Sequence, residues 1–199
     1  MRFIFIRHAQ ATHNSDAVKR GDIAYFDPLN TDAALDLDGV NQAMDAQRHI
    51  VCDAIYCSPL QRCYQTLLLV MPSSHELPVR LDDRLMESQG LAVCNKRKEK
   101  SAIVTSVSPT WDTTHVAEQN PFETLHEGYS RTVSDMPEFC DRIRAFTEYL
   151  VAIHSEEQRI LLVCHHDWIR TWFQLYKGVT VSPKNCEIFY TDLTKQKVD

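Results

Sequence analysis

Three short apolar segments constrain the fold of this chain more than any other feature. They span residues 2–6, 53–57 and 159–164 and are rich in β-branched and aromatic residues. Short runs without regular polar alternation are typical of strands covered on both faces, as in parallel sheets. Segments with helical spacing lie between them. This alternation predicts an α/β fold, a three-layer sandwich in which helices cover both faces of a mainly parallel central sheet.

The helices are predicted from apolar residues that recur every three or four positions. They are expected at residues 36–50, at 59–71, from 134–137 to 153, and at 168–176, and residues 187–191 are expected to form an edge strand. Ser58 and Pro59 are expected to begin the second helix, because a serine hydroxyl can cap a free backbone amide and proline fits the first helical position.

Residues 88–132 show no clear periodicity. The segment is longer than an ordinary connection, and such segments are usually lids, functional loops or insertions. Neither an internal repeat nor a Gly/Ser linker divides the chain. We therefore expect a single domain over residues 1–199, with a lid-like insertion at about 88–132.

Charge and cysteine content exclude several classes of protein. The net charge of −6 at pH 7 argues against non-specific binding to nucleic acid or to a membrane surface. The seven cysteines are scattered and form no C-x-x-C pair, so neither a zinc site nor a disulfide framework is expected. The sequence shows no signal peptide and no stretch long enough to span a bilayer. A cytoplasmic location is expected.

Charged and imidazole side chains follow the predicted strands. Arg7 and His8 end the first strand, the turn from Ser58 to Arg62 follows the second, and His165 and His166 follow the third. Because a charge in a buried strand is costly, and because ligands of α/β sheets bind at the carboxyl ends of strands, we expect these groups to converge. Two guanidinium and two imidazole groups suit a tetrahedral dianion such as phosphate.

A neutral imidazole can attack phosphorus and hold the phosphoryl group transiently. A carboxylic acid must then protonate the departing alkoxide, and Glu87 is the candidate for this role.

At these positions the sequence resembles a known family. RHAQATHN, SPLQRCYQT, LMES and LLVCHHD are similar, in this order, to the four signatures of the histidine phosphatase superfamily, which includes the phosphoglycerate mutase-like proteins. The match extends from Arg7 to Arg170. The resemblance implies that His8 becomes a phosphohistidine and that Arg7, Arg62 and His165 bind the phosphoryl oxygens.

The same resemblance assigns further roles. Glu87 would protonate the leaving group and later help to activate water, and Asn14 would contribute to phosphate or substrate binding. No metal or other cofactor is expected, since arginine and imidazole supply the positive charge. Two departures stand out. Ala9 replaces a glycine of many relatives, and His166-Asp167 replaces two glycines, which makes His166 a candidate substrate contact at the pocket floor.

Some residues are given a structural interpretation. The Lys96–Lys100 run is expected to be an exposed face, with a grip by Arg97 on a second acidic substrate group as the alternative. Trp168 and Trp172 are expected in the core. The remaining histidines are expected to be ordinary surface or packing residues: His13, His49, His75, His115, His126 and His154.

Cys164 and Arg170 have the C-x5-R spacing of cysteine-dependent phosphatases. The loop of those enzymes needs small residues whose amides can wrap a phosphate, and His-His-Asp-Trp-Ile does not meet that need. We therefore reject this interpretation.

The sequence thus favours a metal-independent phosphomonoesterase that acts through a phosphohistidine on a phosphorylated small molecule, with a phosphoprotein as another substrate class. One alternative is a phosphoglycerate mutase-type phosphotransferase, although mutases of the superfamily usually carry longer chains with extra substrate-gripping segments. The other is a non-catalytic module that binds phosphorylated ligands or has a regulatory role. Such a module need not keep all five residues of the site, and this chain has all of them: Arg7, His8, Arg62, Glu87 and His165. The sequence indicates neither the substrate nor the oligomeric state.

Overall fold

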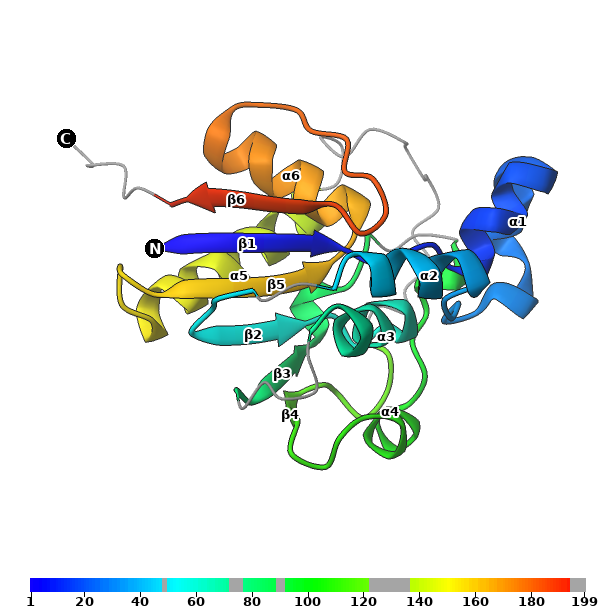
Figure 1. The fold of residues 1–199 in the computed structure, drawn as a ribbon, viewed down its shortest axis with the longest axis horizontal. Helices are drawn as coiled ribbons and strands as arrows, with labels where there is room; N and C mark the ends of the chain where they lie inside the picture. Colours follow the sequence, from blue (N-terminus) through cyan, green and yellow to red (C-terminus); the bar gives the residue numbers. More distant parts are fainter. Residues whose placement is uncertain (48–49, 72–76, 89–91, 122–136, 194–199) are drawn as a thin grey trace.

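The sheet that organises the molecule has six strands. The computed structural model describes residues 1–47, 50–71, 77–88, 92–121 and 137–193. Within them the strand order is β4-β3-β2-β5-β1-β6 (Figure 1). The strands are β1 (Arg2–Arg7), β2 (Ala54–Cys57), β3 (Val79–Asp82), β4 (Asp112–His115), β5 (Arg159–Cys164) and β6 (Ile188–Asp192). All neighbours are parallel except β6, which is antiparallel to β1 at one edge. The predicted α/β fold with a mainly parallel sheet is confirmed.

The central strands β1, β5 and β2 determine where the polar motifs meet. In β1 and β5, Arg2 lies opposite Arg159 and Arg7 lies opposite Cys164. Strand β2 pairs with the other side of β5, so that Cys57 lies opposite Val163. The residues that follow these three strands therefore emerge side by side at the carboxyl edge of the sheet, as the sequence predicted.

Helices cover both faces of the sheet. Alternate strand residues point to opposite faces, so β1 contributes Ile4 and Ile6 to one apolar cluster and Phe3 and Phe5 to the other. The first cluster packs against α2 (Leu37–Asp45), α3 (Gln61–Val70) and α4 (Lys100–Ser106), and the second packs against α5 (Pro137–Ile153) and α6 (His166–Lys177). Figure 1 shows α2 and α3 on the near side of the sheet and α5 on the far side.

Two helices begin at other residues than the sequence predicted. Helix α3 begins at Gln61 rather than Pro59, with Leu60 as its N-cap, so Ser58 does not cap it. Helix α6 begins at His166, two residues earlier than expected, so His166 and Asp167 lie in its first turn. Helix α2 ends at Asp45, and the predicted start of α5 at residues 134–136 lies outside the described residues.

The structure also contains elements that the sequence did not predict. Helix α1 (Thr12–Arg20) carries few apolar residues and buries only His13, which explains why no apolar stripe marked it. The predicted insertion contains α4 and the half-exposed strand β4, and β4 extends the sheet next to β3. The insertion's residues 89–91 and 122–132 lie outside the described residues. Its role as a lid stays a prediction.

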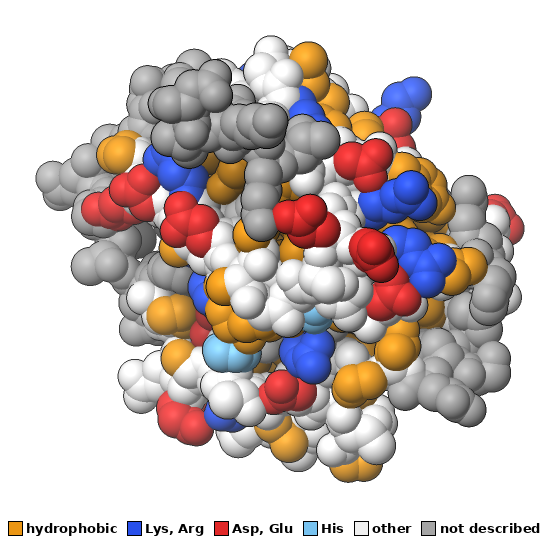
Figure 2. Space-filling view, turned by 90° about the vertical axis from the view of Figure 1, so that its left-hand side faces the viewer, with side chains coloured by type: hydrophobic (Ala, Val, Ile, Leu, Met, Phe, Trp, Pro, Cys, Tyr) orange, Lys and Arg blue, Asp and Glu red, His pale blue; other side chains and the backbone are white. Residues whose placement is uncertain are grey.

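The face at the amino ends of the parallel strands carries both signs of charge. Figure 2 shows acidic and basic side chains interspersed there rather than gathered into a patch of one sign. Arg2 pairs with Asp192, and Arg159 pairs with Asp53. In the parts of the chain described above, no helix is long and apolar enough to cross a bilayer.

Candidate active site

His8 follows β1 directly and is almost completely buried. Its Nδ1 lies 2.7 Å from the carbonyl oxygen of Ala9. Because a carbonyl can only accept a hydrogen bond, Nδ1 carries the proton and Nε2 keeps its lone pair. Burial holds the pKa of His8 well below its usual value, and the nearby Arg62, His165 and Arg7 lower it further. His8 is therefore a neutral imidazole with Nε2 available as a nucleophile.

Helix α2 fixes the loop that follows His8. The backbone amide of Gln10 donates to Gln42 Oε1 at 3.0 Å, and the side-chain amide of Gln10 donates to Asp36 Oδ2 at 3.0 Å. Gly39 permits this contact, since a Cβ at its position would lie 1.9 Å from the carbonyl oxygen of Gln10. The backbone amide of Ala9 donates to Thr66 Oγ1 at 2.9 Å. The loop is thus held by two helices.

Two arginines bring positive charge to this loop. Arg62 of α3 is only 1% exposed, and its two terminal nitrogens donate to the Cys94 carbonyl at 2.7 Å and to Asn95 Oδ1 at 2.8 Å. Arg7 donates to the Pro183 carbonyl at 2.8 Å, and burial lowers its pKa. Within the described part of the chain, neither guanidinium has a carboxylate within salt-bridge distance. Two desolvated cations whose hydrogen-bond partners are neutral favour an anionic ligand.

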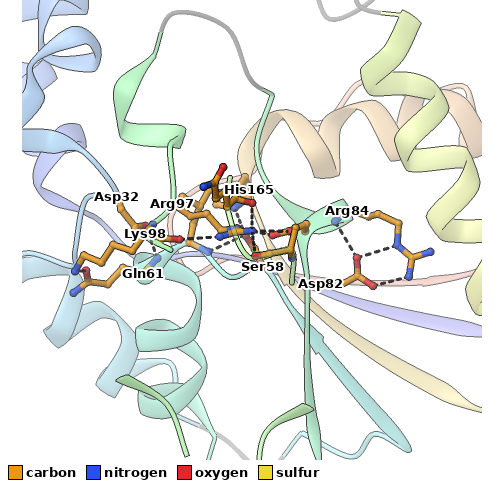
Figure 3. Close-up of polar contacts among 12 residues, drawn as sticks. Asp32, Ser58, Gln61, Asp82, Arg84, Arg97, Lys98 and His165 are labelled. Atoms are coloured by element: carbon orange, nitrogen blue, oxygen red, sulfur yellow. Dashed lines mark hydrogen bonds and ion pairs between the residues drawn. The ribbon is translucent and has the colours of Figure 1, made fainter. Parts of the chain in front are cut away.

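His165 lies at the end of β5 beside His8. The two ring centroids are 5.2 Å apart. Its Nε2 lies 2.9 Å from Ser58 Oγ, a contact that Figure 3 shows between the two labelled side chains. Ser58 therefore contributes to the site, and its Oγ also accepts the backbone amide of Leu60, the N-cap residue of α3, at 3.3 Å. Burial, with Arg62 next, lowers the pKa of His165 far below its usual value. This ring too is neutral.

Glu87 lies after the short 3-10 turn Asp83–Leu85 and faces the start of α6. Its carboxylate accepts the backbone amides of Ser88, at 2.9 Å, and of Asp167, at 3.1 Å. Burial, followed by the negative charge of Asp167, raises the pKa of Glu87 to about 7, although the two amides oppose this. A carboxyl group with this pKa can hold a proton at neutral pH and donate it.

Two neighbours to which the sequence analysis assigned no role support Glu87. Asp167 is held by the Ser88 hydroxyl at 3.2 Å and by His166 Nδ1 at 2.9 Å. Arg142 of α5 donates to the carbonyls of Met86, at 2.9 Å, and of Glu87, at 3.0 Å. No signal in the sequence marked Arg142 among the charged residues of its helix, because its carbonyl partners lie more than fifty residues away.

The structure places the two predicted substrate contacts at the rim of this cluster. Asn14 Oδ1 accepts the backbone amide of Ala11 at 3.0 Å, and its Nδ2 donates to His13 Nε2 at 3.0 Å. His166 is partly exposed and lies between Asp167 and Ser182. Their roles as substrate contacts stay predictions.

His13 is the clearest residue that the sequence analysis missed. It is buried, with 4% exposure, and its ring centroid lies 6.0 Å from that of His8. The available signal was its place inside the RHAQATHN motif, next to Asn14. Of the other histidines, His115 and His154 lie away from the cluster, whereas His49, His75 and His126 lie outside the described residues.

Arg97 does not lie on an exposed face, so the prediction for this part of the Lys96–Lys100 run was wrong. The side chain is buried, its Nε lies 2.7 Å from Asp83 Oδ1, and it also donates to the carbonyls of Ala117 and Gln119. Lys98 is exposed and contacts Gln61 and Asp32, as Figure 3 shows. Arg97 therefore joins the segment around residues 93–119 to the turn before Glu87.

The cysteine-phosphatase interpretation fails on the local backbone. Cys164 is buried in the aromatic cluster around Trp168 and Trp172, which both lie in the core as predicted. Burial raises the pKa of its thiol well above the usual value. Residues 166–170 form the first turns of α6 rather than a loop that could wrap a phosphate. All seven cysteines are free thiols.

Comparison with known proteins agrees with this geometry. The model of the histidine phosphatase superfamily (branch 1) matches residues 3–198. A probable phosphatase of Schizosaccharomyces pombe is 25% identical over 213 residues, which cover 100% of this chain and 87% of that protein.

Two solved structures show the same fold at lower identity. A provisionally assigned alpha-ribazole-5′-P phosphatase from Escherichia coli is 21% identical with a TM-score of 0.62, over 98% of this chain and 92% of that chain. A phosphoglycerate mutase from Thermus thermophilus is 17% identical with a TM-score of 0.57, over 96% of this chain and 93% of that chain. Since the family model spans nearly the whole sequence, this chain belongs to the histidine phosphatase superfamily.

Proposed function

We propose that this protein is a metal-independent phosphomonoesterase that transfers a phosphoryl group first to His8 and then to water. The observation that carries the proposal is the position of a neutral His8, with Nε2 unprotonated, near two arginines that have no carboxylate partner among the described residues. A phosphate dianion would supply the missing negative charge. The phosphatase relative from Schizosaccharomyces pombe supports the same activity.

In the first step, the lone pair of His8 Nε2 forms a bond to phosphorus while the bond from phosphorus to the ester oxygen breaks. The proton of Glu87 passes to the departing oxygen, so the product leaves as an alcohol. The Ala9 carbonyl, 2.7 Å from Nδ1, stabilises the positive charge that the ring gains. Arg7, Arg62 and His165 bind the phosphoryl oxygens and stabilise their charge in the transition state.

In the second step, the ionised Glu87 accepts a proton from water. The water oxygen forms a bond to phosphorus, the bond to Nε2 breaks, and inorganic phosphate leaves. Glu87 is then protonated again, and His8 returns to its neutral form. A carboxyl pKa of about 7 suits both halves of this cycle, because the group must donate and accept one proton near neutral pH.

The substrate we propose is a phosphorylated small molecule rather than a nucleic acid. Asn14 and His166, at the rim, are the proposed contacts to the part of the substrate beyond the phosphate. The segment that we propose as a lid contributes directly to the site, since Cys94 and Asn95 hold the guanidinium of Arg62.

The test is an assay of phosphate release from a panel of phosphorylated metabolites, with and without EDTA. Acid- and alkali-quenched reactions on a ³²P-labelled substrate should reveal an acid-labile, alkali-stable phosphoenzyme. Loss of activity in EDTA that a divalent metal restores would contradict the metal-free mechanism. Interconversion of 2- and 3-phosphoglycerate without phosphate release would instead establish a mutase, and phosphate binding without any turnover would establish a binding module.

A further inference from the structure

Three buried N–H groups near His8 share an unusual property. The Nε of Arg7, the Nε of Arg62 and the Nδ1 of His13 have no hydrogen-bond partner among the described residues, although each is inaccessible to solvent. They come from β1, α3 and α1, respectively. A buried donor without an acceptor is costly and therefore rare. Two of the three belong to the arginines that are proposed to bind phosphate, which directs attention to the third.

The protonation of His13 follows from its neighbour. Asn14 Oδ1 accepts the backbone amide of Ala11 at 3.0 Å, which fixes the side-chain amide with its nitrogen toward His13. This Nδ2 lies 3.0 Å from His13 Nε2. An amide nitrogen can only donate, so Nε2 accepts and the proton of the ring is on Nδ1. Burial, with Arg62 and Arg7, lowers the pKa of His13 to about 2, so the ring is neutral.

The position of the ring restricts what can accept from Nδ1. Its centroid lies 6.0 Å from that of His8 and 5.9 Å from that of Tyr25. A phosphoryl group bound to His8 between the two arginines would bring oxygen atoms, which are strong acceptors, to this part of the site.

We propose that His13 donates a hydrogen bond from Nδ1 to an oxygen of the phosphoryl group at His8, and that Asn14 is a positioning residue that fixes the His13 tautomer. This inference rests on the proposed function. With neutral His165 and the two charged arginines, it gives the phosphoryl group a second neutral donor. A neutral donor stabilises the transition-state oxyanion without attracting a further counter-charge. It also gives Asn14 a second role, through His13, beside the substrate contact proposed above.

The test compares three substitutions. His13→Leu removes the donor, His13→Asn keeps an amide N–H close to the place of Nδ1, and His154→Leu is the control, since His154 contacts Tyr56 and Gln158 away from the site. We expect His13→Leu to lower kcat/KM about 10²-fold, equally on an alkyl phosphate and on p-nitrophenyl phosphate, and to weaken vanadate binding. His13→Asn should recover part of kcat/KM and part of the vanadate affinity. His154→Leu should change neither kcat/KM nor the vanadate affinity.

A second measurement does not depend on turnover. Long-range ¹H–¹⁵N NMR spectra of the imidazoles should show His13 as the Nδ1–H tautomer, and the Nδ1 proton should shift when vanadate is added. Asn14→Asp, whose carboxylate can only accept, should move the proton to Nε2 and lower activity as His13→Leu does.

The outcomes separate this inference from the proposed function. Wild-type rates and vanadate affinity in His13→Leu, or an Nε2–H tautomer in the wild type, would overturn the role of His13. A loss confined to the alkyl phosphate would also overturn it, because it would place His13 at the leaving group. If the wild type hydrolyses no phosphate ester, the proposed function fails, and the vanadate shift of the Nδ1 proton still decides whether His13 contacts the anion.

Discussion

The two ends of the sheet both carry a pair of arginines, but in opposite environments. At the amino end, Arg2 and Arg159 each pair with an aspartate, and the side chain of Arg2 is 69% exposed. At the carboxyl end, Arg62 is 1% exposed, and its terminal nitrogens contact a carbonyl and an amide. Figure 2 shows the mixed charges of the amino end.

This difference distinguishes charges that keep the protein soluble from charges that bind a ligand. An exposed ion pair contributes little, because water solvates both partners and salt screens them. A buried cation without an acidic partner has lost its hydration and gained no counter-charge, which is unfavourable in the ligand-free protein. Such a group is retained where a ligand supplies the negative charge. The predictions below test this contrast, beginning with the largest expected effect and ending with the smallest.

The largest contrast is between His8 and His154, which lies at the amino end beside Tyr56. His8→Ala should lower kcat at least about 10⁴-fold and abolish phosphoenzyme formation, because it removes the nucleophile itself. His154→Ala should leave kcat unchanged. Steady-state rates and acid-quenched labelling measure both effects. A folded His8→Ala variant with substantial turnover would refute the phosphohistidine mechanism.

The next contrast is between Arg62 and Arg159. Arg62→Ala should lower kcat/KM by about 10²- to 10³-fold, since it removes a desolvated donor from the transition state. Arg159→Ala should leave kcat/KM unchanged. Competitive inhibition by vanadate should weaken only in the Arg62 variant. Similar losses in the two variants would mean that burial without an acidic partner does not mark the site.

Glu87 provides a contrast between two substrates. Glu87→Gln should lower the rate on an alkyl phosphate about 10²- to 10⁴-fold. It should lower the rate on p-nitrophenyl phosphate much less, because the phenolate leaves without a proton. Because the pKa of Glu87 is raised to about 7, the acid is present below that pH. The wild-type rate on alkyl phosphates should therefore fall as the pH rises through about 7. The rate of the Glu87→Gln variant should not show this fall, which is the alkaline limb of the pH–rate profile. Equal losses of rate on both substrates would mean that another group donates the proton to the leaving oxygen.

Asp167 and Asp192 allow a smaller test at the two ends. Asp167 raises the pKa of Glu87 through its negative charge. Asp167→Asn should therefore lower that pKa and move the alkaline limb of the rate to lower pH, by about one unit. Asp192→Asn, at the amino end, should leave the pH profile in place. An unmoved limb in the Asp167 variant would show that burial alone determines the pKa of Glu87.

The smallest effect concerns stability at the amino end. Arg2 and Asp192 are both well exposed, and their ion pair spans 3.3 Å. Arg2→Ala should lower the free energy of unfolding by at most about 1 kcal/mol, with less effect at high salt. Urea unfolding at two salt concentrations measures this. A loss several times larger would mean that exposed pairs at this end do stabilise the fold.

Much of the fold could be predicted because its main signals are local. Strands β1, β2 and β5 are short apolar runs, and α5 repeats its apolar residues every three or four positions. Helix α1 and strand β4 could not be predicted in this way. Both carry mostly polar residues, and each is stabilised by contacts that its own sequence does not display, such as the pairing of β4 with β3.

The residues of the candidate site also fall into two groups, those that the local sequence predicts and those that depend on distant contacts. Arg7, His8, Arg62, Glu87 and His165 could be named from residue types, their order and the strand ends that they follow. No local pattern indicated the role of Ser58, which depends on a contact with His165 across 107 residues. Arg97 was expected at the surface, yet Asp83 and two carbonyls from the segment after α4 bury it.

What the sequence by itself determined is which chemical groups exist and at which edge of the sheet they emerge. Unbroken apolar runs mark the buried strands, apolar residues every three or four positions mark the helices, and the carboxyl ends of parallel strands share one edge. What only the tertiary structure decided is the state of those groups. The proton on Nδ1 of His13, the raised pKa of Glu87 and the neutral partners of Arg62 all depend on neighbours that the fold brings into contact. The physical reason is that desolvation and hydrogen bonding are properties of the whole surroundings of an atom, which no single segment specifies.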